Sequence, residues 1–362
     1  MKKFLALLLA LTMALALVAC GGGDDAASDT TADSGDDAAA STGEFEEMTW
    51  KFACSATETS PWVDGAKEFA RIVGEKTGGA ITVQYYPADQ LTGNQTDGIQ
   101  ALMDGTTELS MHSNLIWSSF DQRFNVVSLP FLFSSTEEAD AALDGAGGEA
   151  LGEILESTYN VHLLGIAENG FRHITNSKHA IASKADMNGL KMRVAGSQLL
   201  NRSYELWGAD YTNANWSEVF TALQTGTYDG QENPLPTADA ASIQEVQSYL
   251  TYWTGAYDCL FFCMNAELYN SLSPELQAIV DEAGQAACEY ERELNRSQDQ
   301  EIMDKWAEAG VEITELTPEA AAEFAEASAP VYDEFADELT PELIEAFTSV
   351  TQADAGTTEP AA

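Results

Sequence analysis

The chain has 362 residues, and its 59 aspartates and glutamates far outnumber its 16 lysines and arginines, for a formal net charge of −43 at pH 7. A chain this negative repels polyanions, which excludes nucleic acid and an anionic bilayer as electrostatic partners. Arginine occurs at only seven positions, so each one is informative: Arg71, Arg123, Arg172, Arg193, Arg202, Arg292 and Arg296.

The N-terminus predicts export and a tether. Two lysines precede an apolar run, so residues 1–19 have the pattern of a secretory signal peptide. Cys20 ends the string Leu-Val-Ala-Cys, which resembles a lipobox, and we expect its thiol to be diacylated; an ordinary signal peptide with an incidental cysteine is the alternative. Residues 20–46, the lipidated cysteine and a polar acidic stretch, should form a disordered tether. The lipid would anchor the chain to the outer face of the cell membrane or in the periplasm.

The remaining cysteines give no sign of a metal site. Cys54, Cys259, Cys263 and Cys288 show no CxxC spacing and form no zinc pattern with the four histidines. Cys259 and Cys263 fall in one predicted strand, ~13 Å apart, which is too far for a disulfide. We expect free buried thiols, with a bridge between two distant segments as the alternative. No cofactor and no metal are expected.

The first part of the body alternates strands and helices. Residues 48–56, 81–86 and 109–113 read as strands, and residues 96–103 as a helix. Another helix begins after Ser60, with a proline at its first position, and ends at a Gly-Gly pair. This alternation predicts a mainly parallel sheet covered by helices.

The second part adds further strands and helices. The predicted strands span residues 161–167, 171–175, 190–195 and 311–316, and helices span 197–207 and 216–225. The apolar run 249–264 is long enough to pass between two lobes. Residues 274–309 predict a helical stretch that would be ~54 Å long if unbroken and would then cross both lobes, and two more helices open at the Thr-Pro pairs 317–318 and 340–341.

These elements predict a two-lobe α/β fold with a ligand cleft between the lobes. We assign residues 47–169 and 259–298 to lobe I. Lobe II then comprises residues 170–258 and 299–350, and residues 351–362 form a flexible tail.

Three polar motifs follow one another in the second half. Residues 167–178 contain Arg172, and residues 190–194 contain Arg193 on the same strand face as Lys191. Residues 216–234 predict a helix stopped by a glycine, a tight Asp-Gly turn and a polar segment that holds Glu232 and Asn233 at a stiffened turn. A guanidinium presents its donors as a flat fork that matches a carboxylate, so these motifs favour an anion site.

In this order and spacing, the three motifs resemble the signature of the DctP-like solute receptors of TRAP (tripartite ATP-independent periplasmic) transporters. The resemblance covers about residues 50–311 and is strongest over 168–234. It implies a periplasmic-binding-protein-like fold in which Arg193 makes a two-pronged salt bridge with a ligand carboxylate, Arg172 assists and Asn233 donates a side-chain hydrogen bond. The residues alone leave open that each arginine pairs with a protein carboxylate and that Asn233 only satisfies its own turn.

Weaker site candidates follow from the same resemblance. Trp216 matches an aromatic residue that packs on the ligand, although it fits a core position equally well. Gln95, His112 and Ser55 occupy loop or strand-end positions that contact ligand in relatives. Residues 254–259 depart from the family pattern, which commonly has a histidine near Gly255.

The function predicted is a receptor that captures a small organic anion with a two-arginine clamp, closes its lobes and delivers the anion to the small and large TRAP membrane subunits. An enzyme is not expected, because GxSxG, Walker, HExxH and helix-opening GxGxxG motifs are absent from the sequence. The alternatives are a lipid-tethered sensor that presents the ligand to a signalling partner and a carboxylate-based glycosidase. Dicarboxylates, sugar acids, aromatic acids and branched oxo acids all remain open.

Overall fold

Two mixed β-sheets form the framework of the molecule, seen here in a computed structural model that describes residues 45–355. The predicted signal peptide, Cys20 and all but the last residues of the tether lie outside the described residues. The lobe I sheet has the strand order β2 (Ile81–Tyr86), β1 (Met48–Cys54), β3 (Leu109–Ser113), β10 (Tyr257–Asn265), β4 (Val161–Phe171). The lobe II sheet has the order β11 (Glu312–Glu315), β9 (Tyr249–Tyr252), β5 (His173–Asn176), β8 (Gly230–Asn233), β6 (Lys191–Val194), β7 (Asp210–Asn213).

The predicted two-lobe α/β architecture is confirmed, but neither sheet is purely parallel. In lobe I, β1 pairs in parallel with β2 and β3, while β10 runs antiparallel to β3 and β4. The apolar run 249–264 is two strands in different sheets, because β9 belongs to lobe II and β10 to lobe I. Arg172 is the single residue between β4 and β5, so it stands where the chain first crosses between the sheets.

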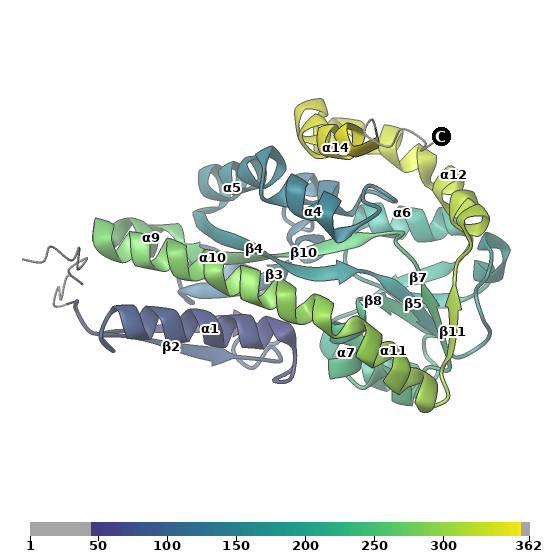
Figure 1. Cartoon of the computed structure of the whole chain (residues 1–362), viewed down its shortest axis with the longest axis horizontal. Helices are drawn as coiled ribbons and strands as arrows, with labels where there is room; N and C mark the ends of the chain where they lie inside the picture. The colour runs from purple at the N-terminus through teal and green to yellow at the C-terminus, as the bar shows by residue number, and fades with distance from the viewer. Residues whose placement is uncertain (1–44, 356–362) are drawn as a thin grey trace, which may run out of the picture. The chain divides into compact units, whose positions relative to one another are not determined.

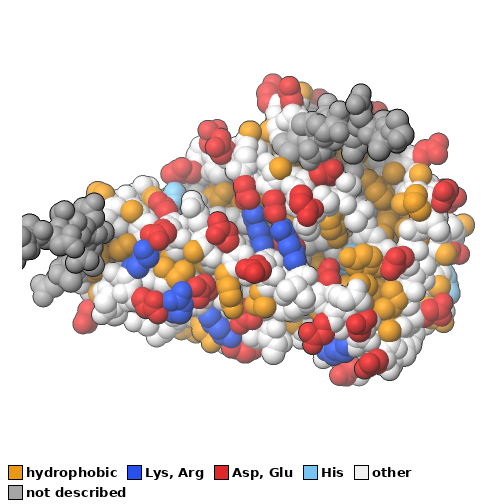
Figure 2. All heavy atoms as spheres, in the orientation of Figure 1, with side chains coloured by type: hydrophobic (Ala, Val, Ile, Leu, Met, Phe, Trp, Pro, Cys, Tyr) orange, Lys and Arg blue, Asp and Glu red, His pale blue; other side chains and the backbone are white. Residues whose placement is uncertain are grey.

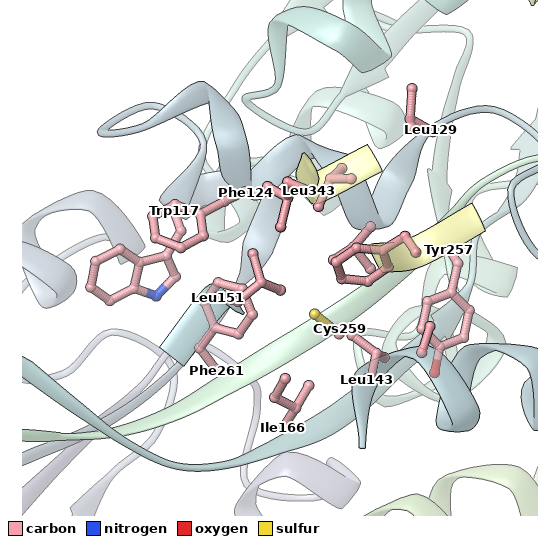
Figure 3. Close-up of a cluster of buried hydrophobic side chains, with 14 of the residues drawn as sticks. Trp117, Phe124, Leu129, Leu143, Leu151, Ile166, Tyr257, Cys259, Phe261 and Leu343 are labelled. Atoms are coloured by element: carbon pink, nitrogen blue, oxygen red, sulfur yellow. The ribbon is translucent and has the colours of Figure 1, made fainter. Parts of the chain in front are cut away.

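Strand β10 is buried along its whole length because helices cover both faces of its sheet. Its side chains alternate between two apolar clusters: Tyr257, Cys259, Phe261 and Cys263 in one, and Leu260, Phe262 and Met264 in the other. Figure 3 shows the first cluster, where Trp117, Phe124 and Phe261 approach one another. It is closed by the helices α3 (Asn114–Trp117), α4 (Thr136–Leu143), α5 (Ala146–Tyr159) and α14 (Pro341–Ala355).

Helices α1 (Pro61–Lys76) and α10 (Pro274–Ser297) lie side by side over the other face of the lobe I sheet (Figure 1). As predicted, the Ser60 hydroxyl caps α1, where it accepts a hydrogen bond from the Trp62 backbone N–H. The remaining helices of lobe I are the short α2 (Gln95–Met103) and α9 (Ala266–Ser271). Lobe II carries α6 (Gln198–Trp207), α7 (Trp216–Gln224) and α8 (Leu235–Ala240).

The predicted 274–309 helix is broken in two. The first part, α10, packs on α1 and β4 in lobe I; the second, α11 (Asp299–Glu308), packs on α8 and β11 in lobe II. Gln298 separates them. The two lobes are therefore connected by two consecutive helices, α10 and α11, rather than by one continuous helix.

The C-terminal part departs from the predicted lobe assignment. Helix α12 (Pro318–Glu334) packs on α6 of lobe II as expected, but α13 (Ala336–Leu339) and α14 pack on lobe I. The reason is apolar burial: Leu343 and Phe347 join the lobe I cluster, with Phe347 close to Phe133 and against Gly147, where no side chain intervenes. Helix α14 also continues to Ala355, so residues 351–355 are helical rather than part of a flexible tail.

The four cysteines of the described body are free and buried, as expected. Within residues 45–355 no cluster of three or more histidine, cysteine, aspartate or glutamate side chains has the arrangement of a metal site. None of the described helices combines the length and the apolar composition that a membrane span requires. Acidic side chains are spread over the face seen in Figure 2, and the few basic ones lie next to them.

Candidate functional site: a polar pocket between the lobes

A small pocket with a cavity volume of about 30 Å³ lies between the two sheets, and both lobes line it. Lobe I contributes Ser55, Ala56, Trp62, Gln95, Ser113, Ile116, Asn169 and Asp258. Lobe II contributes Arg193, Ala195, Trp216, Asn233 and Thr237, and Arg172 stands at the crossing. A second hollow of about 370 Å³ shares Gln95, Ile116, Arg193 and Trp216 with the pocket and continues it outward.

Arg193 projects from β6, between β7 and β8. Its neighbours Met192 and Val194 enter the lobe II core, and this alternation turns Arg193 toward the pocket, as the motif predicted. The Arg193 side chain is only 4% exposed, and its Nε and Nη2 both donate to the Ala214 carbonyl, at 3.1 and 2.8 Å. The guanidinium lies 5.6 Å from the centre of the Trp216 ring, within cation–π range.

No carboxylate of the described residues lies within ion-pair distance of Arg193, whereas each of the other six arginines has at least one such partner. Burial lowers the pKa of Arg193 to about 10; the charge of Glu232 opposes this shift, and the like charge of Arg172 adds to it. Its guanidinium is therefore still charged at neutral pH, and its charge is poorly solvated.

Arg172 is as deeply buried but fully engaged. Its Nε pairs with the Glu232 carboxylate, its Nη1 pairs with Asp258, and its Nη2 donates to the Glu232 carbonyl at 2.8 Å. The second Glu232 oxygen accepts the backbone N–H of Ala195 at 2.9 Å. The sequence left open whether Arg172 faces a ligand or pairs with a protein carboxylate. In the structure it forms ion pairs within the protein, and its side chain also lines the pocket.

Glu232 and Asn233 lie in strand β8 and not at the turn predicted for them. β8 pairs with β5 and β6 and is buried throughout, which its polar sequence Gly-Gln-Glu-Asn did not suggest. The polar side chains are buried with partners: Glu232 on Arg172, and Gln231 on Thr175 at 3.0 Å. Asn233 lines the pocket and donates to the Gln231 side chain at 2.8 Å.

Three of the weaker candidates also reach the pocket and one does not. Trp216, Gln95 and Ser55 line it. The Gln95 side-chain oxygen accepts the backbone N–H of Ser113 at 3.3 Å, and the Ser55 hydroxyl donates to Asp89. His112 lies in β3 under α2, fully buried and away from the pocket lining.

Several pocket residues escaped the sequence analysis, chiefly Asp258, Trp62 and Asn169. Asp258 is fully buried inside the apolar β10, a position where a charge is costly unless it has partners. It accepts the Ser113 hydroxyl at 2.8 Å and the Asn169 amide at 2.6 Å, besides Arg172. The one available signal was an aspartate within the 254–259 segment that departs from the family pattern.

Two α/β lobes joined by crossing strands and by the consecutive helices α10 and α11, with a polar pocket between them, define a two-lobe solute-binding protein. A model of the DctP family, described as bacterial extracellular solute-binding protein, family 7, matches residues 52–339. The chain belongs to this family. The resemblance to DctP-like receptors of TRAP transporters is thereby confirmed, and the protein is a transport receptor, not an enzyme.

Individual relatives agree with this assignment. The chain is 32% identical over 276 residues to the 2,3-diketo-L-gulonate-binding periplasmic protein YiaO of Escherichia coli (strain K12), which covers 76% of this chain and 84% of that protein. The sugar acid binding protein DctPAm of Advenella mimigardefordensis strain DPN7T, solved with galactonate, superposes with a TM-score of 0.82 at 28% identity, covering 85% and 99% of the two chains. A TRAP periplasmic solute binding protein of Sulfurospirillum deleyianum DSM 6946, solved with succinate, gives 0.79 at 29% identity, with coverages of 84% and 100%.

Proposed function

We propose that this receptor captures a small organic acid in the pocket between its lobes, with Arg193 as the main partner of the ligand carboxylate. The observation that carries the proposal is the buried Arg193 guanidinium, which contacts a carbonyl and an aromatic ring but has no carboxylate within ion-pair distance among residues 45–355. The burial of an unpaired charge opposes folding unless something compensates it. A bound carboxylate supplies that compensation.

The two arginines then have unequal tasks. Arg193 contributes the uncompensated charge, while the charge of Arg172 is balanced by Glu232 and Asp258. A guanidinium has five N–H donors, and the hydrogen bonds of Arg172 to Glu232 and Asp258 use three of them. Arg172 therefore assists, as the family resemblance implied, but as a neutralised donor group rather than as a second cation.

Capture involves both lobes. Ser55, Gln95 and Asp258 come from lobe I, and Arg193, Trp216 and Asn233 from lobe II, so a ligand that contacts all of them favours the closed arrangement. The break between helices α10 and α11 at Gln298, where the chain passes from lobe I to lobe II, is compatible with such a motion. The closed receptor then docks onto the small and large TRAP membrane subunits, and the lipid on Cys20 keeps it at the membrane.

Thermal shift with matched acids and neutral analogues tests the proposal. We expect at least one of galactonate, galacturonate and succinate to raise the Tm of the purified protein, because a ligand that binds the folded state and not the unfolded state stabilises the protein. The methyl ester of galacturonate and the diamide of succinate keep the size of their parent acids but lack the charge, and they should give no shift. Equal shifts from an acid and its neutral analogue, or no shift from a broad panel of organic acids, would contradict the assignment of Arg193.

A further inference from the structure

We infer that the ligand carries one carboxylate and several hydroxyl groups, as aldonic and uronic acids do, and that the pocket discriminates against dicarboxylates. The inference rests on the proposed function and adds the ligand class. It follows from the charges that surround the pocket and from the hydrogen-bonding groups that line it.

The charges leave room for a single anion. Arg172 and Arg193 bring two positive charges to the site, and Glu232 and Asp258 bring two negative ones. The other pocket residues are neutral, and neither a lysine nor a histidine lines the pocket. One ligand carboxylate pairs with Arg193, and the described pocket lining offers no further unpaired cation to a second carboxylate.

Asp258 sets the specificity at the lobe I wall. Its Oδ2 is occupied by Arg172 and Asn169, whereas its Oδ1 accepts only the Ser113 hydroxyl in this structure. A carboxylate oxygen accepts more than one hydrogen bond, so Oδ1 suits a ligand hydroxyl. A second ligand carboxylate at this wall meets like charge and offers no donor, which is an arrangement that selects against it.

The rest of the lining supplies hydroxyl and amide groups. Ser55, Ser113 and Thr237 contribute hydroxyls, and Asn169 and Asn233 contribute amides. Trp62, at the start of α1, has a buried indole N–H with no partner among the described residues, and it lines the pocket. A buried donor without a partner is costly to a protein, and a ligand oxygen removes that cost. A polyhydroxy acid matches this mixed set of groups better than a short dicarboxylate with two charged ends.

Calorimetry on the purified wild-type protein is the first test. We expect galactonate or galacturonate to bind at least about tenfold more tightly than succinate at the same pH and ionic strength. Succinate that binds as tightly as the sugar acids, or more tightly, overturns this inference and leaves the proposed function standing. Failure of every acid to bind overturns the proposed function itself.

Two variants locate the discrimination. Asp258→Asn removes the negative charge and leaves Arg172 less neutralised, so a second ligand carboxylate meets less repulsion and we expect the preference over succinate to narrow or reverse. Because Arg172 loses a buried partner in this variant, folding is checked by circular dichroism. Trp62→Phe keeps the ring and deletes only the N–H, and we expect it to weaken sugar-acid binding by about threefold to tenfold. Trp50→Phe is the matched control, since the Trp50 indole N–H is also buried without a partner but lies away from this pocket. Equal effects of the two tryptophan variants, or an unchanged preference in Asp258→Asn, would count against the inference.

Discussion

Replacement of Arg193 by lysine is the sharpest test of the site, because it keeps the charge and removes the fork. In the wild type, the Arg193 Nε and Nη2 hold the Ala214 carbonyl, and the plane of the guanidinium is supported by Trp216. A lysine ammonium is a compact point donor and cannot reproduce both the Ala214 contacts and a two-pronged carboxylate contact. We expect Arg193→Lys to lower ligand affinity by at least about tenfold, which corresponds to ~1.4 kcal/mol.

Arg193→Gln goes further, because it leaves the ligand carboxylate buried without a cation. Loss of one partner from a buried ion pair costs ~3–5 kcal/mol, so we expect calorimetry to detect little or no binding. Arg202→Lys is the control, since Arg202 lies on α6 and pairs with Glu334 and Glu205 on the surface. Arg193→Lys with wild-type affinity, or Arg202→Lys with the same loss, would refute the role assigned to Arg193.

Three further predictions concern stability and anchoring. Burial, and to a smaller extent the charge of Glu168, raises the pKa of Asp299 to about 6. The folded protein therefore holds this proton more tightly than the unfolded chain, and the stability that the protonated carboxyl contributes is lost as pH rises from about 4 through 6. Asp299→Asn should therefore gain ~1–2 kcal/mol over the wild type in urea unfolding at pH 7.5 and nothing near pH 4, and an equal gain at both pH values would contradict this account. In Gly98→Ala the new Cβ would lie 2.5 Å from the buried His112 ring, so we expect the free energy of unfolding in urea to fall by ~1–3 kcal/mol despite the better helix propensity of alanine. Gly74→Ala is the control: its nearest atom lies at 3.8 Å, and we expect the free energy of unfolding to rise by ~0.5–1 kcal/mol. Cys20→Ser should release the protein from the membrane fraction of the cells that produce it, and an unchanged distribution would remove the lipid anchor from the account.

The elements with strong local signals could be predicted from the sequence. Strand β1 and helix α1 matched because apolar periodicity, the Ser60 cap and the Pro61 start all agree. Helices α4 and α5 were missed because they are rich in alanine, glycine and glutamate, so their buried faces are short of large apolar side chains. The sequence predicts a turn at the position of strand β8, because a polar strand is buried only when distant partners satisfy its side chains, and those partners are not adjacent in sequence.

The same distinction applies to the site. Arg193 could be predicted because a lone arginine alternates with core residues on a short strand. The state of Arg172 could not be predicted, because Glu232 and Asp258 lie 60 and 86 residues further along the chain and only the crossing of the lobes brings them together. His112 was placed in the site by its position near a strand end, but the pleat directs it under α2, where burial lowers its pKa to about 3 and keeps it neutral.

The acidic surface and the anion site are compatible because of how the cations are distributed. Exposed arginines such as Arg71 and Arg202 are held by neighbouring carboxylates, so they offer no competing surface sites for an organic acid. The surface field is screened over ~8 Å at physiological ionic strength, whereas Arg193 acts at contact distance in a pocket where its side chain is buried. A receptor of this charge therefore does not attract its ligand from a distance; it selects the ligand at contact, through Arg193, a cation with no ion-pair partner in the described part of the chain. The association rate should then depend weakly on salt, while affinity should depend strongly on the single side chain at position 193.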